Sequence, residues 1–139
     1  MNKLTGVLTR IQKSGSILLV DIDVDGYSFS ALLIESDTHL EWLETENTVS
    51  LVFKETEVSL AKDLTGKISL RNRMQCKVLL VERGELLSTV KLQFKEYIVT
   101  SAITTRAVGS LQITIGDEIE ALVKSNEISL MQLPITNDK

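Results

Sequence analysis

The sequence predicts an all-β protein with short helices, built as two tandem copies of one small barrel. Three observations predict this: a recurring segment, short strand patterns in each copy, and an aliphatic composition. The recurring segment reads K-E-T-E-V-S-L at Lys54–Leu60 and K-S-N-E-I-S-L at Lys124–Leu130, roughly 70 residues later. A segment that returns at such an interval indicates a duplicated module.

Strand patterns follow the same order in both copies. Val20–Val24 alternates apolar residues with aspartates, the period-two pattern of a half-buried strand. Asp25-Gly26 and Arg83-Gly84 are turn signals. We expect the register between copies to slip by one residue at two loops. The aligned segments are Thr5–Ile11 with Gln75–Val81, Val20–Val24 with Val90–Phe94, Tyr27–Leu33 with Tyr97–Ile103, and Val49–Lys54 with Ile119–Lys124.

One short helix is expected in each copy. In the first copy Ser36 and Asp37 can cap a turn, with Leu40 and Leu43 on one face. In the second copy the helix is expected at Ala107–Leu111. About five strands and one short helix in each copy are typical of a Greek-key barrel of the OB type.

The join between the copies is expected near Asp63–Gly66, where turn-forming residues gather. We therefore predict a first domain over residues 1–65 and a second over residues 66–133. The polar end, residues 134–139, is expected to be a flexible tail.

Composition narrows the function classes. Hydrophobic residues make up 43% and aromatic residues 4%, so the core is aliphatic. The net charge of −4 disfavours a dedicated nucleic-acid binder. No signal peptide and no membrane-spanning run are evident, so we expect a cytoplasmic protein without a membrane partner. Small barrels with thin cores favour a homo-oligomer.

Two binding motifs are incomplete. Asp21–Gly26 reads like the start of a calcium loop, but Leu32 stands where that loop needs a bidentate glutamate. A solvated strand face is the better interpretation. Leu64–Ser69 resembles the end of a phosphate loop. That loop requires a glycine upstream of Gly66, and Ala61 occupies this position.

Catalysis is not expected. His39 and Cys76 are the only histidine and the only cysteine, and they lie in different copies, so no nucleophile–base pair can be formed from them. Cys76 sits in an apolar strand and is expected to be a buried structural thiol. A single cysteine also excludes an intrachain disulfide.

The polar residues Ser69, Arg71 and Asn72, together with Lys54 and Lys124, are the strongest functional signal. Each lysine ends an apolar strand, and the position recurs in both copies. Cations, hydroxyls and free backbone N–H groups are the donors that a tetrahedral oxyanion needs. These residues therefore predict an oxyanion site.

The second copy resembles a domain of the molbindin (Mop, TOBE-like) family of molybdate-binding proteins. That family carries S-A-R-N, then I-S/T-x-x-S before a short helix, then L-x-L-x-x-G-x-x-V, and finally K-A/S. The corresponding segments are Ser69–Asn72, Ile103–Ala107, Leu111–Ile119 and Lys124–Ser125.

The first copy matches this family more loosely. Leu32–Ser36 keeps the serine of the second element, and Lys54-Glu55 stands for the last one. Of the first element only Asn2 remains, with Met1 in the place of the arginine. Conversely, the second copy has Ala107 where the family has serine.

The resemblance implies cytoplasmic binding of molybdate or tungstate for storage or homeostasis, in a homo-oligomer that is most simply a trimer. Family sites lie between modules, so we expect Ser69, Arg71 and Asn72 to meet the Ser36 and Lys54 side of a first copy in a tight site, and two affinity classes overall. The oxyanion-binding residues that the resemblance implies are Ser69, Leu70, Arg71, Asn72, Thr104, Ala107, Lys124, Ser125, Ser36 and Lys54.

Two alternatives stay open. One is a regulatory interaction module whose bound anion changes its contacts with a molybdate transporter or a transcription regulator. The other is an OB-type nucleic-acid binder, which needs aromatic side chains on one strand face and a basic groove. The acidic charge and scattered aromatics disfavour it. Those aromatics are Tyr27, Phe29, Phe53, Phe94 and Tyr97.

Overall fold

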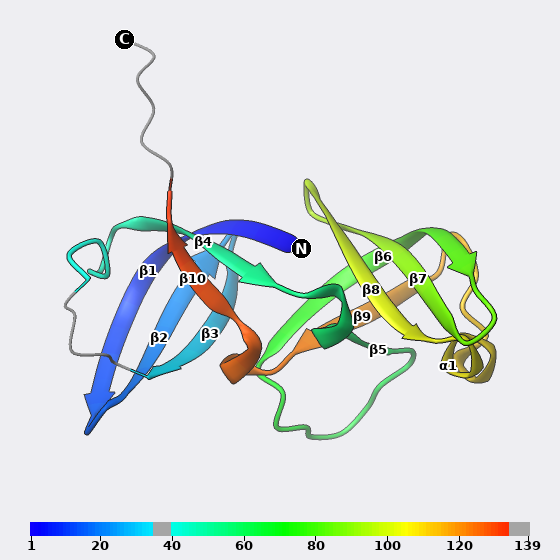
Figure 1. Ribbon diagram of the computed structural model, residues 1–139, viewed down its shortest axis with the longest axis horizontal. Helices are drawn as coiled ribbons and strands as arrows, with labels where there is room; N and C mark the ends of the chain where they lie inside the picture. Colours follow the sequence, from blue (N-terminus) through cyan, green and yellow to red (C-terminus); the bar gives the residue numbers. More distant parts are fainter. Residues whose placement is uncertain (35–39, 134–139) are drawn as a thin grey trace, which may run out of the picture.

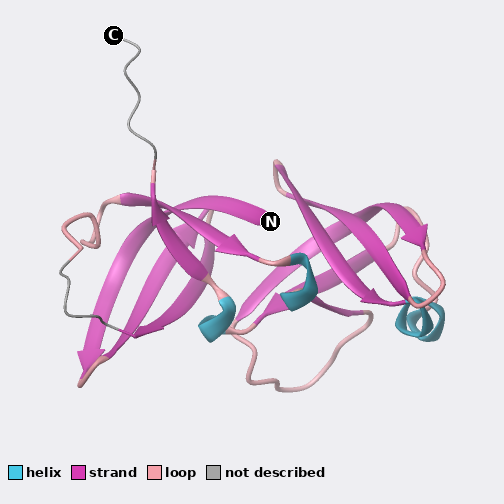
Figure 2. Cartoon of the chain, in the orientation of Figure 1, coloured by secondary structure: helices cyan, strands magenta, loops and turns pink. Residues whose placement is uncertain are grey.

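The computed structural model describes residues 1–34 and 40–133. It confirms the predicted fold class: two curled, five-stranded antiparallel sheets lie side by side, with only short helices between strands (Figure 1). Figure 2 shows how little of the chain is helical. Within the described residues no helix has the length and apolar character needed to cross a membrane.

Each sheet has the same strand order. The first is ordered β10-β4-β1-β2-β3 and the second β5-β9-β6-β7-β8. The strands of the first sheet are β1 (Asn2–Ser14), β2 (Ile17–Val24), β3 (Tyr27–Ile34), β4 (Thr48–Phe53) and β10 (Ser129–Gln132). Those of the second are β5 (Ser59–Ala61), β6 (Asn72–Arg83), β7 (Leu87–Phe94), β8 (Tyr97–Thr104) and β9 (Glu118–Val123).

The elements of the two copies follow each other at a constant offset in the numbering. Each of the five strands in the second copy, and its one 3₁₀ turn, begins 70 residues after its counterpart in the first. The expected register slip at two loops is therefore wrong. Loop lengths are conserved between the copies because they set where each strand enters its sheet.

The last strand of each copy belongs to the sheet of the other copy. Strand β5 pairs with β9, placing Leu60 opposite Ala121, and β10 pairs with β4, placing Leu130 opposite Leu51. Figure 1 shows β10, drawn in orange to red, in the half on the left, and β5 in the half on the right. The predicted boundary near residue 65 thus divides the sequence copies, whereas the sheets draw on both.

An aromatic cluster joins the halves. The Phe94 ring makes edge contacts with Tyr27 at 4.9 Å and Phe29 at 6.1 Å, and stacks on Tyr97 at 6.5 Å. Phe29 and Phe94 are fully buried. Four of the aromatics that look scattered in sequence are therefore gathered, but they serve as packing at the junction and not as an exposed stacking platform.

Helical segments differ from expectation. The helix of the second copy is α1 (Thr105–Leu111), two residues longer at its start than predicted. In the first copy the proposed caps Ser36 and Asp37 lie outside the described residues, and residues 40–47 form turns with no helix. Two 3₁₀ turns, η1 (Glu55–Glu57) and η2 (Ser125–Glu127), were not predicted.

The other sequence predictions have mixed outcomes. Asp21 and Asp23 lie on β2 and its hairpin, as expected for a strand face. Asp25 and Gly26 form the β2–β3 turn with positive φ angles of 50° and 91°. Residues 134–139 and His39 lie outside the described residues. No group of three metal-ligating side chains forms in the part of the chain that is described.

Candidate oxyanion site at the junction of the halves

Two buried asparagines hold the halves together. Asn72 begins β6 and lies against β3 of the other sheet: its Oδ1 accepts from the Ser30 N–H at 2.7 Å, and its Nδ2 donates to the Ser30 and Val123 carbonyls at 3.0 Å each. Asn2 begins β1 and makes the corresponding pair with Thr100 on β8, at 2.7 and 2.9 Å. The junction is therefore pseudo-symmetric, and its geometry is fixed by main-chain partners.

Beside Asn72, residues of both copies line a groove of about 340 Å³. The loop before β6 contributes Ser69 and Leu70, and the start of η2 contributes Lys124 and Ser125. Leu32 of β3 closes the side that belongs to the first copy. The groove thus combines a cation, two hydroxyls and an apolar wall, without a carboxylate.

Arg71 lines an adjoining depression together with Ser30 and Ser125. The Ser30 and Ser125 hydroxyl oxygens are 2.6 Å apart, which ties β3 to η2. Asp21 also lines this depression. Arg71 and Lys124 thus line two adjoining depressions that share Ser125, and two cations close to one hydroxyl are suitable partners for an anion.

Neither Arg71 nor Lys124 forms an ion pair with any residue that the structure describes. Both side chains are exposed. By contrast, Arg73, two residues on, is held by Glu120 through two bonds of 2.7 and 2.9 Å. The two cations at the groove are thus not neutralised by a carboxylate of the described residues, whereas Arg73 is.

Two carboxylates lie next to the groove. Glu57 and Glu127 line a third depression that shares Ser69 and Lys124 with the groove. An anion is repelled from that side, because like charges raise its energy. The favourable position is consequently the part of the groove next to Ser125 and Leu32.

The side chain of Asn72, one of the expected anion ligands, has no free hydrogen-bond donor in this structure. Both hydrogens of its Nδ2 and its Oδ1 are already used, and the residue is completely buried. An asparagine amide offers only two N–H donors. Its role is to position the Arg71 segment against β3.

Thr104 and Ala107 lie at the other end of the second sheet. Thr104 is paired with Leu87, near the Arg83 end of β6, whereas Val123, just before Lys124, is paired with Asn72. The Thr104 Oγ1 accepts from the Ala107 N–H at 3.0 Å and caps α1. Within one chain these two residues are not brought to the groove.

The expected meeting of the Arg71 segment with Lys54 and Ser36 is also not seen within one chain. Ser69 and Arg71 lie against Lys124 and Ser125 of their own copy, and Ser36 lies outside the described residues.

Two first-copy residues complete the candidate site, Leu32 in the groove and Ser30 in the adjoining depression, and the sequence analysis identified neither. They lie on β3, whose alternating pattern looks like that of any other strand. No local motif marks them, because their role comes only from the packing of β3 against β6.

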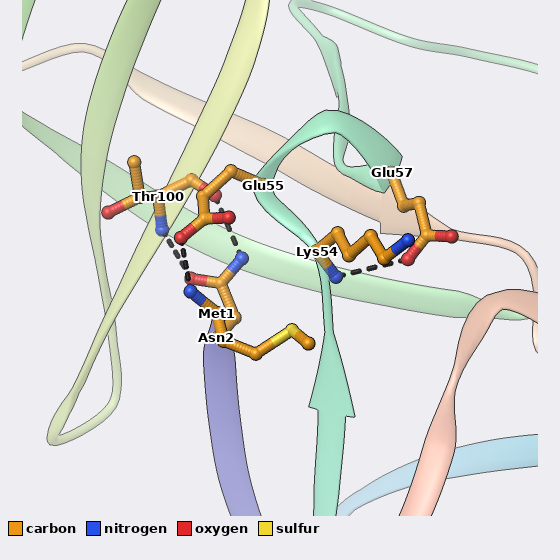
Figure 3. A network of polar contacts seen from close by, with 6 residues as sticks. All are labelled: Met1, Asn2, Lys54, Glu55, Glu57 and Thr100. Carbon is orange, nitrogen blue, oxygen red and sulfur yellow. Dashed lines mark hydrogen bonds and ion pairs between the residues drawn. The ribbon is translucent and has the colours of Figure 1, made fainter.

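The corresponding position in the first copy carries different charges (Figure 3). Glu55 stands where Ser125 stands in the second copy, and its carboxylate pairs with the terminal amine of Met1. This hydrogen bond lowers the pKa of Glu55 from its ordinary value. Lys54 donates its backbone N–H to Glu57 at 3.0 Å. An internal anion is thus already present there.

Cys76 is buried in β6, which confirms the expected structural thiol. Burial raises the pKa of this thiol from 9.0 to about 12. A nucleophilic cysteine requires the thiolate at neutral pH, so Cys76 is unsuited to that role.

Known proteins match both the sequence and the fold. Residues 68–130 match the model of the TOBE domain, which confirms the family resemblance where it is strongest. The chain is 34% identical over 108 residues, 77% of its length, to the Molybdenum import ATP-binding protein ModC of Brucella abortus (strain 2308), Brucella suis biovar 1 (strain 1330) and Brucella melitensis biotype 1 (strain ATCC 23456 / CCUG 17765 / NCTC 10094 / 16M). The chain spans 28% of the length of these relatives.

Among solved structures, the cytoplasmic molybdate-binding protein ModG, in a form with molybdate bound, matches with a TM-score of 0.89 and 24% identity, over 95% of this chain and 96% of that one. A molybdate binding protein from Sporomusa ovata matches 48% of this chain and all of its own, with a TM-score of 0.48 and 30% identity. The ModG match shows that the overall fold of this chain is a known one.

Proposed function

We propose that this chain, which carries a TOBE domain at residues 68–130 and has the fold of ModG, binds molybdate or tungstate at the junction groove. The observation that carries the proposal is the pair of cations Arg71 and Lys124, which form no ion pair with the described residues and line adjoining depressions that share Ser125. A dianion is costly to dehydrate unless several donors meet it, and this groove supplies charge and hydroxyls together.

The role we propose is storage or buffering of the oxyanion in the cytoplasm, without catalysis. The relatives that share the sequence and the fold are named for molybdenum import and molybdate binding. The groove holds no nucleophile–base pair, and the one cysteine is buried. Binding and release of the anion are the chemistry that this arrangement supports.

We also propose that the protein assembles with itself, most simply as a trimer, and without a nucleic acid or membrane partner. Four apolar side chains, which pair across β2 and β3, are exposed on the first sheet beside the groove. Exposed apolar patches of this kind mark interaction surfaces. The four residues are Ile17, Leu19, Leu32 and Ile34.

A second candidate function is an anion-responsive regulatory module for a molybdate transporter. It is favoured by the 34% identity to ModC, an ATP-binding import protein of which this chain matches a part. In that case the anion-bound form would contact a transporter component. The two candidates are separated by asking whether molybdate changes binding to a transporter ATPase.

Calorimetric titration with molybdate, tungstate, sulfate and phosphate tests the first proposal, with the oligomer's mass measured by light scattering. We expect molybdate and tungstate to bind and the smaller anions to bind more weakly. Arg71→Ala and Lys124→Ala should each weaken binding about ten- to a hundredfold, because each removes a charged hydrogen bond. Lys91→Ala, which removes an exposed cation on β7, is the matched control. Equal affinity in all four proteins would remove the groove as the site.

A further inference from the structure

The junction contains two pseudo-equivalent positions, and they differ in charge. Lys54 corresponds to Lys124, Thr100 to Ser30 and Asn2 to Asn72, each 70 residues apart. Both asparagines make the same pair of main-chain bonds, so the two sides match at these clamps. The side chains that would face an anion are what differ.

Among the differences between the two positions, two change the charge of a side chain. Glu55 stands in the place of Ser125, and Met1 in the place of Arg71. Ser125 presents a neutral hydroxyl bonded to Ser30, whereas Glu55 presents a carboxylate that pairs with the Met1 amine. Glu57 and Glu127 occupy equivalent places and therefore do not account for the difference.

We propose that Glu55 acts as an internal anion, filling the first-copy position and leaving each chain with one junction site for an external oxyanion. This inference rests on the proposed function of the groove. Figure 3 shows the Glu55 carboxylate on the same side as Met1, Asn2 and Thr100, the group that corresponds to the proposed site. A carboxylate there repels a dianion and uses the cationic donor that the dianion would need.

The Glu55 carboxylate should lower the affinity of the first-copy position for a dianion. A dianion a few ångströms from a fixed carboxylate is disfavoured even in a water-like environment, by an amount on the order of tenfold or more in affinity. The loss is larger because the partner amine is already neutralised. The first-copy position therefore stays free of molybdate at concentrations that fill the groove at Ser125.

Exchanging the side chains at positions 55 and 125 tests the proposed role of Glu55. Molybdate is titrated calorimetrically into the wild type, Glu55→Ser, Ser125→Glu and Ser125→Gln, and the number of bound anions per chain is measured. We expect one in the wild type and two in Glu55→Ser, the second weaker because Met1 lacks the guanidinium of Arg71. Ser125→Glu should lose at least tenfold in affinity, and Ser125→Gln, which adds bulk without charge, distinctly less. Glu44→Ser removes an exposed carboxylate elsewhere and should behave as the wild type.

The outcomes separate the two proposals. A wild type that binds no molybdate overturns the proposed function itself. A wild type that binds two anions per chain with equal affinity, or a folded Glu55→Ser variant that still binds one, overturns the role of Glu55 and leaves the groove intact. Thermal melting of each variant verifies that it is folded, which is expected because Glu55 is partly exposed with a side-chain accessibility of 38%.

Discussion

Asn72 binds the peptide of Ser30 from both sides, accepting from its N–H at 2.7 Å and donating to its carbonyl at 3.0 Å. One side chain thereby acts as a short piece of strand between the two sheets. Because Arg71 precedes it and Ser30 contacts Ser125, the clamp also sets the geometry of the groove. Stability and anion binding are coupled at this residue.

Asn72→Ala should lower the free energy of unfolding by about 1–3 kcal/mol, because it leaves buried main-chain donors and acceptors without partners. Asn2→Ala should have a similar effect on the other side of the junction. Urea unfolding measures both. Asn47→Ala, which removes an exposed bond to the Trp42 carbonyl, is the control and should cost clearly less. Unchanged stability of Asn72→Ala would contradict the clamp.

Because the last strand of each copy pairs in the sheet of the other copy, a proline placed in that strand should disturb the other copy's sheet. Leu130→Pro lies in the second copy but should expose the amides of β4 in the first sheet, since Leu130 is opposite Leu51. Leu60→Pro should instead expose β9, since Leu60 is opposite Ala121. Proline removes a ladder N–H and cannot be accommodated within paired strands. Hydrogen exchange resolved by residue measures this, and deprotection of β9 by Leu130→Pro would show that each copy keeps its own strand.

Molybdate should raise the melting temperature, because it binds the folded junction and not the unfolded chain. At 100 times the dissociation constant the gain is about 2.7 kcal/mol for each independent site. Sulfate at the same concentration should give a much smaller shift, and Arg71→Ala should lose most of the molybdate shift. Scanning calorimetry at fixed ionic strength measures it. Equal shifts with both anions would indicate general anion binding without selectivity.

Cys76 should make stability fall at alkaline pH. Its pKa is about 12 in the folded protein against 9.0 for a free thiol, so the unfolded chain releases the proton first. The contribution is complete below pH 9 and is lost between pH 9 and 12, at about 1.4 kcal/mol for each pH unit. Urea unfolding of the wild type and Cys76→Ala from pH 8 to 10.5 measures the difference in slope. Parallel curves would mean that the thiol is accessible.

Much of the architecture is contained in the sequence. The repeat of K-x-x-E-V/I-S-L, the alternation in Val20–Val24 and the turn at Asp25-Gly26 predict duplicated, short-stranded barrels. These are local signals, since period and turn chemistry act over a few residues. The family resemblance likewise directs attention to Ser69–Asn72 and Lys124-Ser125, which the structure places together.

Only the tertiary structure decided which copy supplies the last strand of each sheet and which residues line the candidate site. The sequence does not show that β5 and β10 change places, because a last strand can satisfy its hydrogen bonds in either sheet with the same pattern. Nor does it show that the Asn72 side chain is fully bonded to the main chain of Ser30 and Val123. It also does not show that Leu32 lines the groove, that Ser30 lines the adjoining depression, or that Thr104 lies at the far end of the second sheet. These facts depend on contacts between residues distant in the chain, and such contacts leave no local pattern to read.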